Sequence, residues 1–280
     1  MSGNDLVLRP GPDGVRLIRD LAYARAYTLR VGGTDQSYVD LDDARRLEFD
    51  YLEQIAVVVD TVAPPGEPVR AVHLGGAAMS LPRYVAVTRP RSAQLVFEPD
   101  AELTAFVRTH LPLPPRSGIR VRAVDGRSGL VGLRNGSVDL IIVDAFVGPR
   151  TPADLTTLEC WTEVRRVLAP GGTVVGNITD RGPLGYARRV LAGLAACLPQ
   201  RLLMVESSTL KGRRFGNVIL VGSGRPLATE EIAARAGRVL YPYRVLAGER
   251  LAQLLAGATP FTDADPEESP RPPGGRAHFP

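Results

Sequence analysis

The chain has 280 residues, of which 44% are hydrophobic and 23% are charged, the composition of an ordinary soluble globular protein long enough to bury a sizeable core. Its formal net charge is +4, and nearly all of the positive charge is arginine, since Lys211 is the only lysine. The arginines are spread along the chain without interleaved aromatic residues, which argues against a nucleic-acid surface.

The two cysteines and three histidines give no indication of a metal site. Cys160 and Cys197 occur in no metal-ligand spacing, which fits a reduced cytoplasmic setting. The histidines are scattered in the sequence, and His73 is expected to pack at the end of a strand. No apolar run approaches the roughly 18 residues that span a bilayer, and the N-terminus lacks the apolar core of a signal peptide. We therefore expect a cytoplasmic protein without a metal, a membrane anchor or a nucleic-acid partner.

Residues 1–62 are predicted to form a small antiparallel β unit followed by a helix. Three short segments alternate apolar and polar residues and are flanked by Gly and Asp: 15–18, 26–31 and 36–41. The helix is predicted over 44–62, because Leu47, Tyr51, Ile55 and Val58 recur on one face.

Strands and helices then alternate regularly through residues 63–258. The strands are predicted at 69–74, 94–97, 120–124, 140–143 and 173–176, and the helices at 81–88, 101–110, 156–168 and 184–197. This alternation indicates an α/β, doubly wound and mostly parallel sheet. Residues 201–206 and 217–221 add an edge hairpin and give seven strands. Residues 259–280, rich in Pro and acidic residues, are predicted to be a largely disordered tail.

Glycines or carboxylates follow several of the predicted strands, at the edge where open parallel sheets bind ligands. They are Gly75 and Gly76, Glu98, Asp125 with Gly126, and Asp144. Glu98 lies 23 residues after Gly75, close to the roughly 20-residue spacing of a ribose-binding carboxylate. Taken singly, the glycines could form only a tight turn and each carboxylate could cap a helix. The G-x-G-x-x-G pattern is absent, which argues against an NAD-dependent oxidoreductase.

Several motifs together resemble the spermidine synthase (polyamine aminopropyltransferase) family. The segments that carry the resemblance are Val138-Asp-Leu-Ile-Ile-Val-Asp144-Ala-Phe-Val-Gly-Pro149, Leu155-Thr-Thr-Leu-Glu159 and Leu168-Ala-Pro-Gly-Gly-Thr-Val-Val-Gly-Asn177. The branch most resembled has Asp-Ala-Phe in place of the synthases' Asp-Ser-Ser-Asp-Pro. The resemblance extends back through 97–100 and 124–127 and forward to 260–263, and it covers about residues 26–221.

The resemblance implies a class I methyltransferase-like, Rossmann-like domain that binds S-adenosylmethionine, its decarboxylated form or methylthioadenosine. By position, Gly75 and Gly76 would face the amino-acid or aminopropyl end of the ligand. Glu98 would bind the ribose hydroxyls, and Asp125, followed by Gly126, would meet the adenine. Asp144 would contact the donor and take the proton from the attacking amine, unless it only caps the next helix or orients the cofactor. Gln36 and Tyr38 would line the substrate cleft, and 148–152 could close over it.

Two departures from the family pattern concern the acceptor. Val147 replaces the second aspartate of the signature, and Ala78 stands in a glycine turn that carries an aspartate in true synthases. Both changes argue against putrescine, because a dication needs acidic partners. The resemblance therefore predicts aminopropyl transfer to a small-molecule amine or another acceptor. A methyltransferase and a non-catalytic nucleoside-binding protein remain alternatives, and a homodimer is left open.

Overall fold

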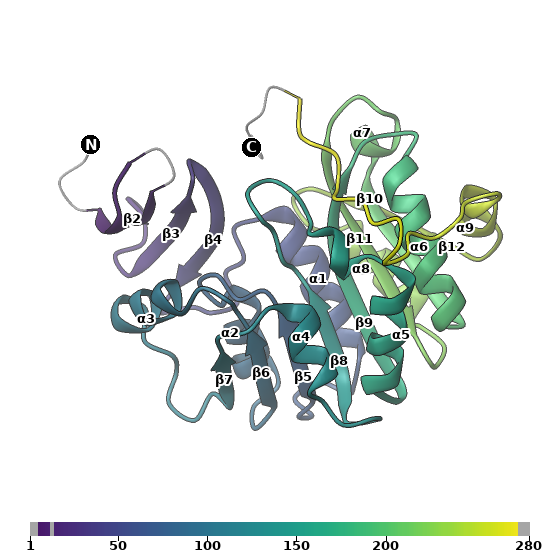
Figure 1. Ribbon diagram of the computed structural model, residues 1–280. Helices are drawn as coiled ribbons and strands as arrows, with labels where there is room; N and C mark the ends of the chain where they lie inside the picture. Colours follow the sequence, from purple (N-terminus) through teal and green to yellow (C-terminus); the bar gives the residue numbers. More distant parts are fainter. Residues whose placement is uncertain (1–4, 12–13, 274–280) are drawn as a thin grey trace.

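The computed structural model describes residues 5–11 and 14–273 and contains two sheets (Figure 1). The smaller, N-terminal sheet is antiparallel, with strand order β1-β2-β3-β4. Its strands are β1 (Leu6–Arg9), β2 (Val15–Arg19), β3 (Ala26–Val31) and β4 (Thr34–Asp40). The sequence predicts three of them and misses β1.

The larger sheet has eight strands in the order β12-β10-β11-β9-β8-β5-β6-β7. They are β5 (Arg70–Leu74), β6 (Ala93–Phe97), β7 (Ile119–Arg122), β8 (Val138–Val143), β9 (Leu168–Asp180), β10 (Gln200–Glu206), β11 (Gly216–Ser223) and β12 (Tyr243–Ala247). Strands β5 to β9 pair in parallel, and β10 to β12 add three antiparallel pairings. The predicted count of seven strands missed β12, which lies at the edge of the sheet and pairs only with β10.

Helices cover both faces of the larger sheet. They are α1 (Asp50–Thr61), α2 (Ser80–Thr88), α3 (Ala101–His110), α4 (Gly126–Val131), α5 (Leu158–Val167), α6 (Gly185–Cys197), α7 (Ser207–Leu210), α8 (Thr229–Ala236) and α9 (Gly248–Leu255), with a 3-10 turn, η1, at Ala153–Leu155. Alternate residues of a strand point to opposite faces, so Ile141 and Val143 of β8 pack with α5 and α6 while Leu140 and Ile142 pack with α1. No helix within the described residues combines the length and apolar character needed to cross a bilayer.

The N-terminal sheet lies over the carboxyl ends of β5 and β6. Leu17 and Leu29 of this sheet share a buried cluster with Val107 of α3 and Met79. The hydroxyl of Ser80, the first residue of α2, donates to the Tyr38 carbonyl at 2.7 Å. These contacts hold β4 beside the turn that follows β5, where the sequence predicts a ligand.

The helix expected over 44–62 begins only at Asp50. The carboxylate of Asp40 accepts hydrogen bonds from the N–H groups of Asp42 and Asp43 and pairs with Arg46. Such side-chain bonds to nearby backbone groups compete with helix formation. They keep 41–49 out of the helix.

The segment after residue 258 packs against the larger domain as far as it is described, in contrast to the disorder predicted for it. Phe261 is fully buried, with its ring 5.2 Å from that of Tyr186, measured between centroids. Asp263 accepts a hydrogen bond from the Thr157 hydroxyl at 2.6 Å. One aromatic anchor and a set of specific hydrogen bonds therefore order a stretch whose composition alone indicates disorder. Residues 274–280 lie outside the described part of the chain.

Candidate active site

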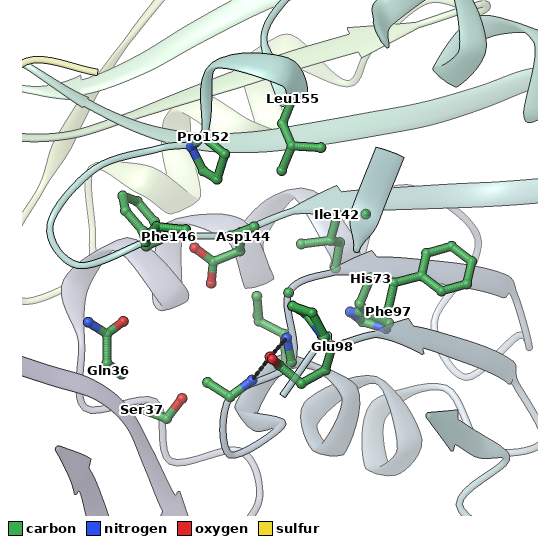
Figure 2. Close-up of a pocket in the computed structure, with 18 of the residues that line it drawn as sticks. Gln36, Ser37, His73, Phe97, Glu98, Ile142, Asp144, Phe146, Pro152 and Leu155 are labelled. Carbon is green, nitrogen blue, oxygen red and sulfur yellow. Dashed lines mark hydrogen bonds between the residues drawn. The ribbon is translucent and has the colours of Figure 1, made fainter. Parts of the chain in front are cut away.

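A cavity of about 320 Å³ lies at the carboxyl ends of β5, β6 and β8, next to β4 (Figure 2). Its volume is within the roughly 300–1,000 Å³ typical of small-molecule sites. The chain leaves β5 toward β6 on one side, and β8 pairs on the other, so the cavity lies at the point where the strand order reverses. Most of the predicted site residues line it: Gln36, Gly75, Gly76, Glu98, Asp125, Gly126 and Asp144.

The glycine pair after β5 is required by close backbone contacts. Gly75 has φ +93°, and a Cβ there would lie 2.2 Å from the carbonyl oxygen of Asp144. A Cβ on Gly76 would lie 2.8 Å from the Val96 side chain and 3.2 Å from Cβ of Glu98. Any side chain at either position would displace the backbone or fill the cavity wall. The turn therefore depends on glycine for steric reasons.

Glu98 holds this turn through main-chain hydrogen bonds. Its Oε2 accepts from the N–H of Gly76 at 3.1 Å and of Ala77 at 3.0 Å (Figure 2). Its Oε1 accepts from the N–H of Asp100 at 3.1 Å. The residue is 9% exposed. A carboxylate has about four acceptor positions, so Glu98 retains capacity for ligand donors.

Asp125 and Gly126 lie at the start of α4. The Asp125 side chain caps the helix by accepting from the Ser128 N–H at 2.8 Å, and this bond holds the pKa of the carboxyl below its usual range. Asp125 also lines the cavity. The capping role and the ligand-binding role are compatible, because capping uses Oδ1 and leaves Oδ2.

Asp144, directly after β8, faces the cavity from the side opposite Ser37 and Gln36 (Figure 2). Its Oδ1 accepts a hydrogen bond from Nδ2 of Asn177 at 3.0 Å. Burial raises the pKa of this carboxyl to about 6. A carboxylate with this pKa is ionised at neutral pH and is a stronger proton acceptor than an ordinary aspartate.

The two residues predicted on β4 are placed differently. The pairing runs Leu29 with Ser37 and then Arg30 with Asp35, so Gln36 is an extra, bulged residue. Gln36 and Ser37 line the cavity. Tyr38 instead is 2% exposed, lies outside the cavity lining, and its hydroxyl donates to Asp20 at 3.1 Å. The prediction of Tyr38 came from the family resemblance; the bulge at Gln36 shifts the strand so that Ser37, and not Tyr38, lines the cavity.

Further cavity residues were not predicted as site residues: Ser37, Tyr51, His73, Phe146 and Leu155. His73 does pack at the end of its strand, with Nε2 2.9 Å from Oε1 of Gln94, and burial lowers its pKa to about 4, which keeps it neutral at physiological pH. Its position one residue before the end of β5 was the available signal. Within the described residues, no three His, Cys, Asp or Glu side chains are grouped to hold a metal ion.

The two positions that depart from the family signature differ in environment. Val147 lines the cavity and is 71% exposed. Ala78 is fully buried, and its N–H donates to the Ser37 hydroxyl at 3.3 Å. Of the two, only Val147 lies where an added carboxylate could reach a bound molecule.

The loop after β8 is held by the C-terminal segment 267–272 (yellow in Figure 1). The Thr151 N–H donates to the Ser269 hydroxyl at 2.8 Å, and Nε of Arg150 donates to the Ser269 carbonyl at 2.6 Å. Arg150 also pairs with Glu268. The loop carries Phe146 and Pro152 into the cavity lining. The position of this part of the cavity wall thus depends on residues that follow more than a hundred positions later in the sequence.

Proteins of similar sequence and fold are named as polyamine aminopropyltransferases or spermidine synthases. No family model matches the chain. The chain is 28% identical over 156 residues to the polyamine aminopropyltransferase of Vibrio vulnificus, covering 54% of this chain and 51% of that one. A structure described as a probable spermidine synthase from Corynebacterium glutamicum matches with a TM-score of 0.84 and 29% identity, over 89% of this chain and 93% of that chain. In sequence and in fold the chain is therefore similar to the spermidine synthase family.

These similarities confirm the resemblance found in the sequence, and the fold prediction is confirmed with it. Human methyltransferase-like protein 13, solved in complex with SAH, shares the fold, with a TM-score of 0.50 and 21% identity over 76% of this chain and 93% of that one. The chain spans about half the length of the Vibrio vulnificus relative. Its own reaction and substrates are therefore matters of proposal.

Proposed function

We propose that the cavity binds an adenosyl sulfonium donor, S-adenosylmethionine or its decarboxylated form, and that the chain transfers an aminopropyl group from the decarboxylated donor to an amine. The observation that carries the proposal is the convergence of Glu98, Asp125 and Asp144, from the ends of three strands, on one cavity. The Vibrio vulnificus relative is named for aminopropyl transfer.

The cavity residues fit the donor's hydrogen-bonding groups. Ribose hydroxyls and an adenine amino group are hydrogen-bond donors, and Glu98 and Asp125 supply acceptor-only oxygens. Glu98 is already fixed by three main-chain N–H groups, so little side-chain freedom is lost when a ligand binds. Gly75 and Gly76 line the cavity next to Asp144 without projecting a side chain into it, where the aminopropyl end would lie.

In this proposal Asp144 prepares the nucleophile. An acceptor amine enters as its ammonium form and gives one proton to the Asp144 carboxylate, whose pKa of about 6 keeps it ionised at neutral pH. The nitrogen lone pair then forms a bond to the aminopropyl carbon next to the sulfonium. The carbon–sulfur bond breaks with its electron pair going to sulfur, so the neutral thioether leaves without a general acid. Asp144 later releases its proton to solvent.

Donor binding and group transfer can be tested separately. We expect methylthioadenosine and at least one of the two donors to raise the melting temperature; no shift with any of the three would contradict the donor site. The protein is then incubated with amines and either decarboxylated donor labelled in the aminopropyl group or methyl-labelled S-adenosylmethionine. Aminopropyl product is expected. Methyl product would instead indicate a methyltransferase, and binding without product a non-catalytic protein.

A further inference from the structure

A second, smaller hollow adjoins the cavity and is lined by Asn177, the hydrogen-bond partner of Asp144. It is lined by Thr34, Asp35, Gln36, Tyr51, Phe146, Gly148, Pro149, Asn177 and Asn217. Gln36, Tyr51 and Phe146 line both spaces, so the hollow continues the cavity past these three residues. It is the space into which the remainder of an acceptor held at Asp144 would extend.

One polar atom of this hollow lacks a partner. Asn177 is 1% exposed, and its Nδ2 donates to Asp144, but its Oδ1 has no hydrogen-bond partner among the described residues. A buried acceptor without a donor is unfavourable. Because Asn177 lines the hollow and holds Asp144, an N–H group bound at the Asp144 carboxylate is the donor best placed to satisfy Oδ1.

The charge of the hollow is matched to a single cation. Asp144 is a carboxylate with no ion-pair partner among the described residues. The other acid, Asp35, is neutralised by Arg30, whose Nε and Nη2 lie 2.5 and 3.0 Å from its two carboxylate oxygens. The remaining walls are aromatic, amide or small: Tyr51, Phe146, Pro149 and Asn217. A second ammonium group here would lose water without gaining a free carboxylate.

We infer that the acceptor is a primary monoamine, whose nitrogen lies between the Asp144 carboxylate and Oδ1 of Asn177 and whose neutral tail lies against Tyr51 and Phe146. This inference rests on the proposed function. The ammonium gives one proton to Asp144 while another N–H donates to Asn177. The freed lone pair forms the nitrogen–carbon bond, and the carbon–sulfur bond pair goes to sulfur as described above.

Butylamine and 1,4-diaminobutane form a matched pair of probes, since they differ in the second amine at equal carbon-chain length. With labelled decarboxylated donor, we expect kcat/KM for butylamine to exceed that for the diamine at least tenfold. Equal use of both, or preference for the diamine, overturns the monoamine inference while leaving aminopropyl transfer intact. No product from any amine overturns the proposed function, and the inference with it.

Two variants test the residues themselves. Asn177→Ala should lower kcat/KM for butylamine at least tenfold while methylthioadenosine still raises the melting temperature, which shows an intact fold; an unchanged kcat/KM overturns the assignment of Asn177.

Val147→Asp places a carboxylate on the exposed cavity rim and should raise the ratio of diamine to monoamine kcat/KM about tenfold. Val147→Asn, equal in shape but uncharged, should leave that ratio as in the native chain; an equal rise in both variants would exclude the electrostatic explanation.

Discussion

The two halves of the cavity are built in different ways. The proposed donor half, around Gly75, Gly76 and Glu98, consists of a turn whose shape is imposed by backbone contacts and three main-chain hydrogen bonds. The proposed acceptor half consists of side chains from β4, α1, the loop after β8, β9 and β11. A site shaped by main-chain contacts tolerates few substitutions. A site formed by side chains can acquire a different ligand specificity when single residues are replaced. Of the two departures from the family signature, only Val147 lines the cavity, in the loop of the proposed acceptor half, while Glu98 and Asp125 are in place.

Among the substitutions considered, one at Gly75 should have the largest effect on the donor half, because it introduces a steric clash in the turn. Gly75→Ala would force a Cβ to within 2.2 Å of the Asp144 carbonyl oxygen at φ +93°. We expect no detectable binding of methylthioadenosine by calorimetry and a loss of about 2–4 kcal/mol in the free energy of unfolding. Gly136→Ala is the control, because Gly136 also has a positive φ, +61°, but open space around it. If both variants bind normally, the turn does not shape the donor site.

Asp144 lies between the halves and should matter for transfer more than for donor binding. Asp144→Asn is expected to lower kcat about 10²- to 10⁴-fold while methylthioadenosine affinity changes little. In the native protein the base must be ionised, so kcat/KM should fall about tenfold per pH unit below the pKa of about 6. Steady-state rates between pH 5 and 8 measure this. Retained turnover in the variant would exclude Asp144 as the base.

Glu98 tests whether the donor half depends on charge as well as shape. In Glu98→Gln one oxygen becomes an NH₂ group, which would face either the N–H groups of Gly76 and Ala77 or that of Asp100. We expect the affinity for methylthioadenosine to fall about 10- to 100-fold, the cost of losing a hydrogen bond to a charged group. Calorimetric titration measures this. An unchanged affinity would indicate that the carboxylate serves only the turn.

The same contrast explains what the sequence could predict. Gly75, Gly76 and Glu98 are local features, fixed by strand ends and by a spacing that every βαβ unit of this kind needs. Their convergence with Asp125 and Asp144 follows from the parallel sheet. The sheet itself was predicted except for β12, and α1 begins later than expected because Asp40 binds the backbone ahead of it.

The acceptor half was harder to predict because it depends on tertiary contacts. One bulged residue in β4 moved Tyr38 out of the lining and brought Ser37 into it. In the sequence Asn177 could be recognised only as the residue at the end of a predicted strand. Its hydrogen bond to Asp144 depends on the pairing of β8 with β9, which the sequence does not show. The ordering of 259–273 likewise depends on a pocket for Phe261 that composition does not reveal.

The smallest effect should appear at Ser269, which acts on the acceptor half through the loop after β8. Ser269→Ala removes the acceptor for the Thr151 N–H and the contact with Thr179 Oγ1 at 3.1 Å. Leaving a buried N–H unpaired costs about 1–3 kcal/mol. We expect part of this cost to appear as a rise of about threefold to tenfold in KM for the amine, with donor affinity unchanged.

Glu267→Ala, at an exposed neighbouring position, is the control and should leave KM as in the native chain. A fall in donor affinity as large as the rise in KM would show that the C-terminal segment stabilises the whole domain. Loss confined to the amine would show that the acceptor half is positioned by side-chain contacts from outside the sheet.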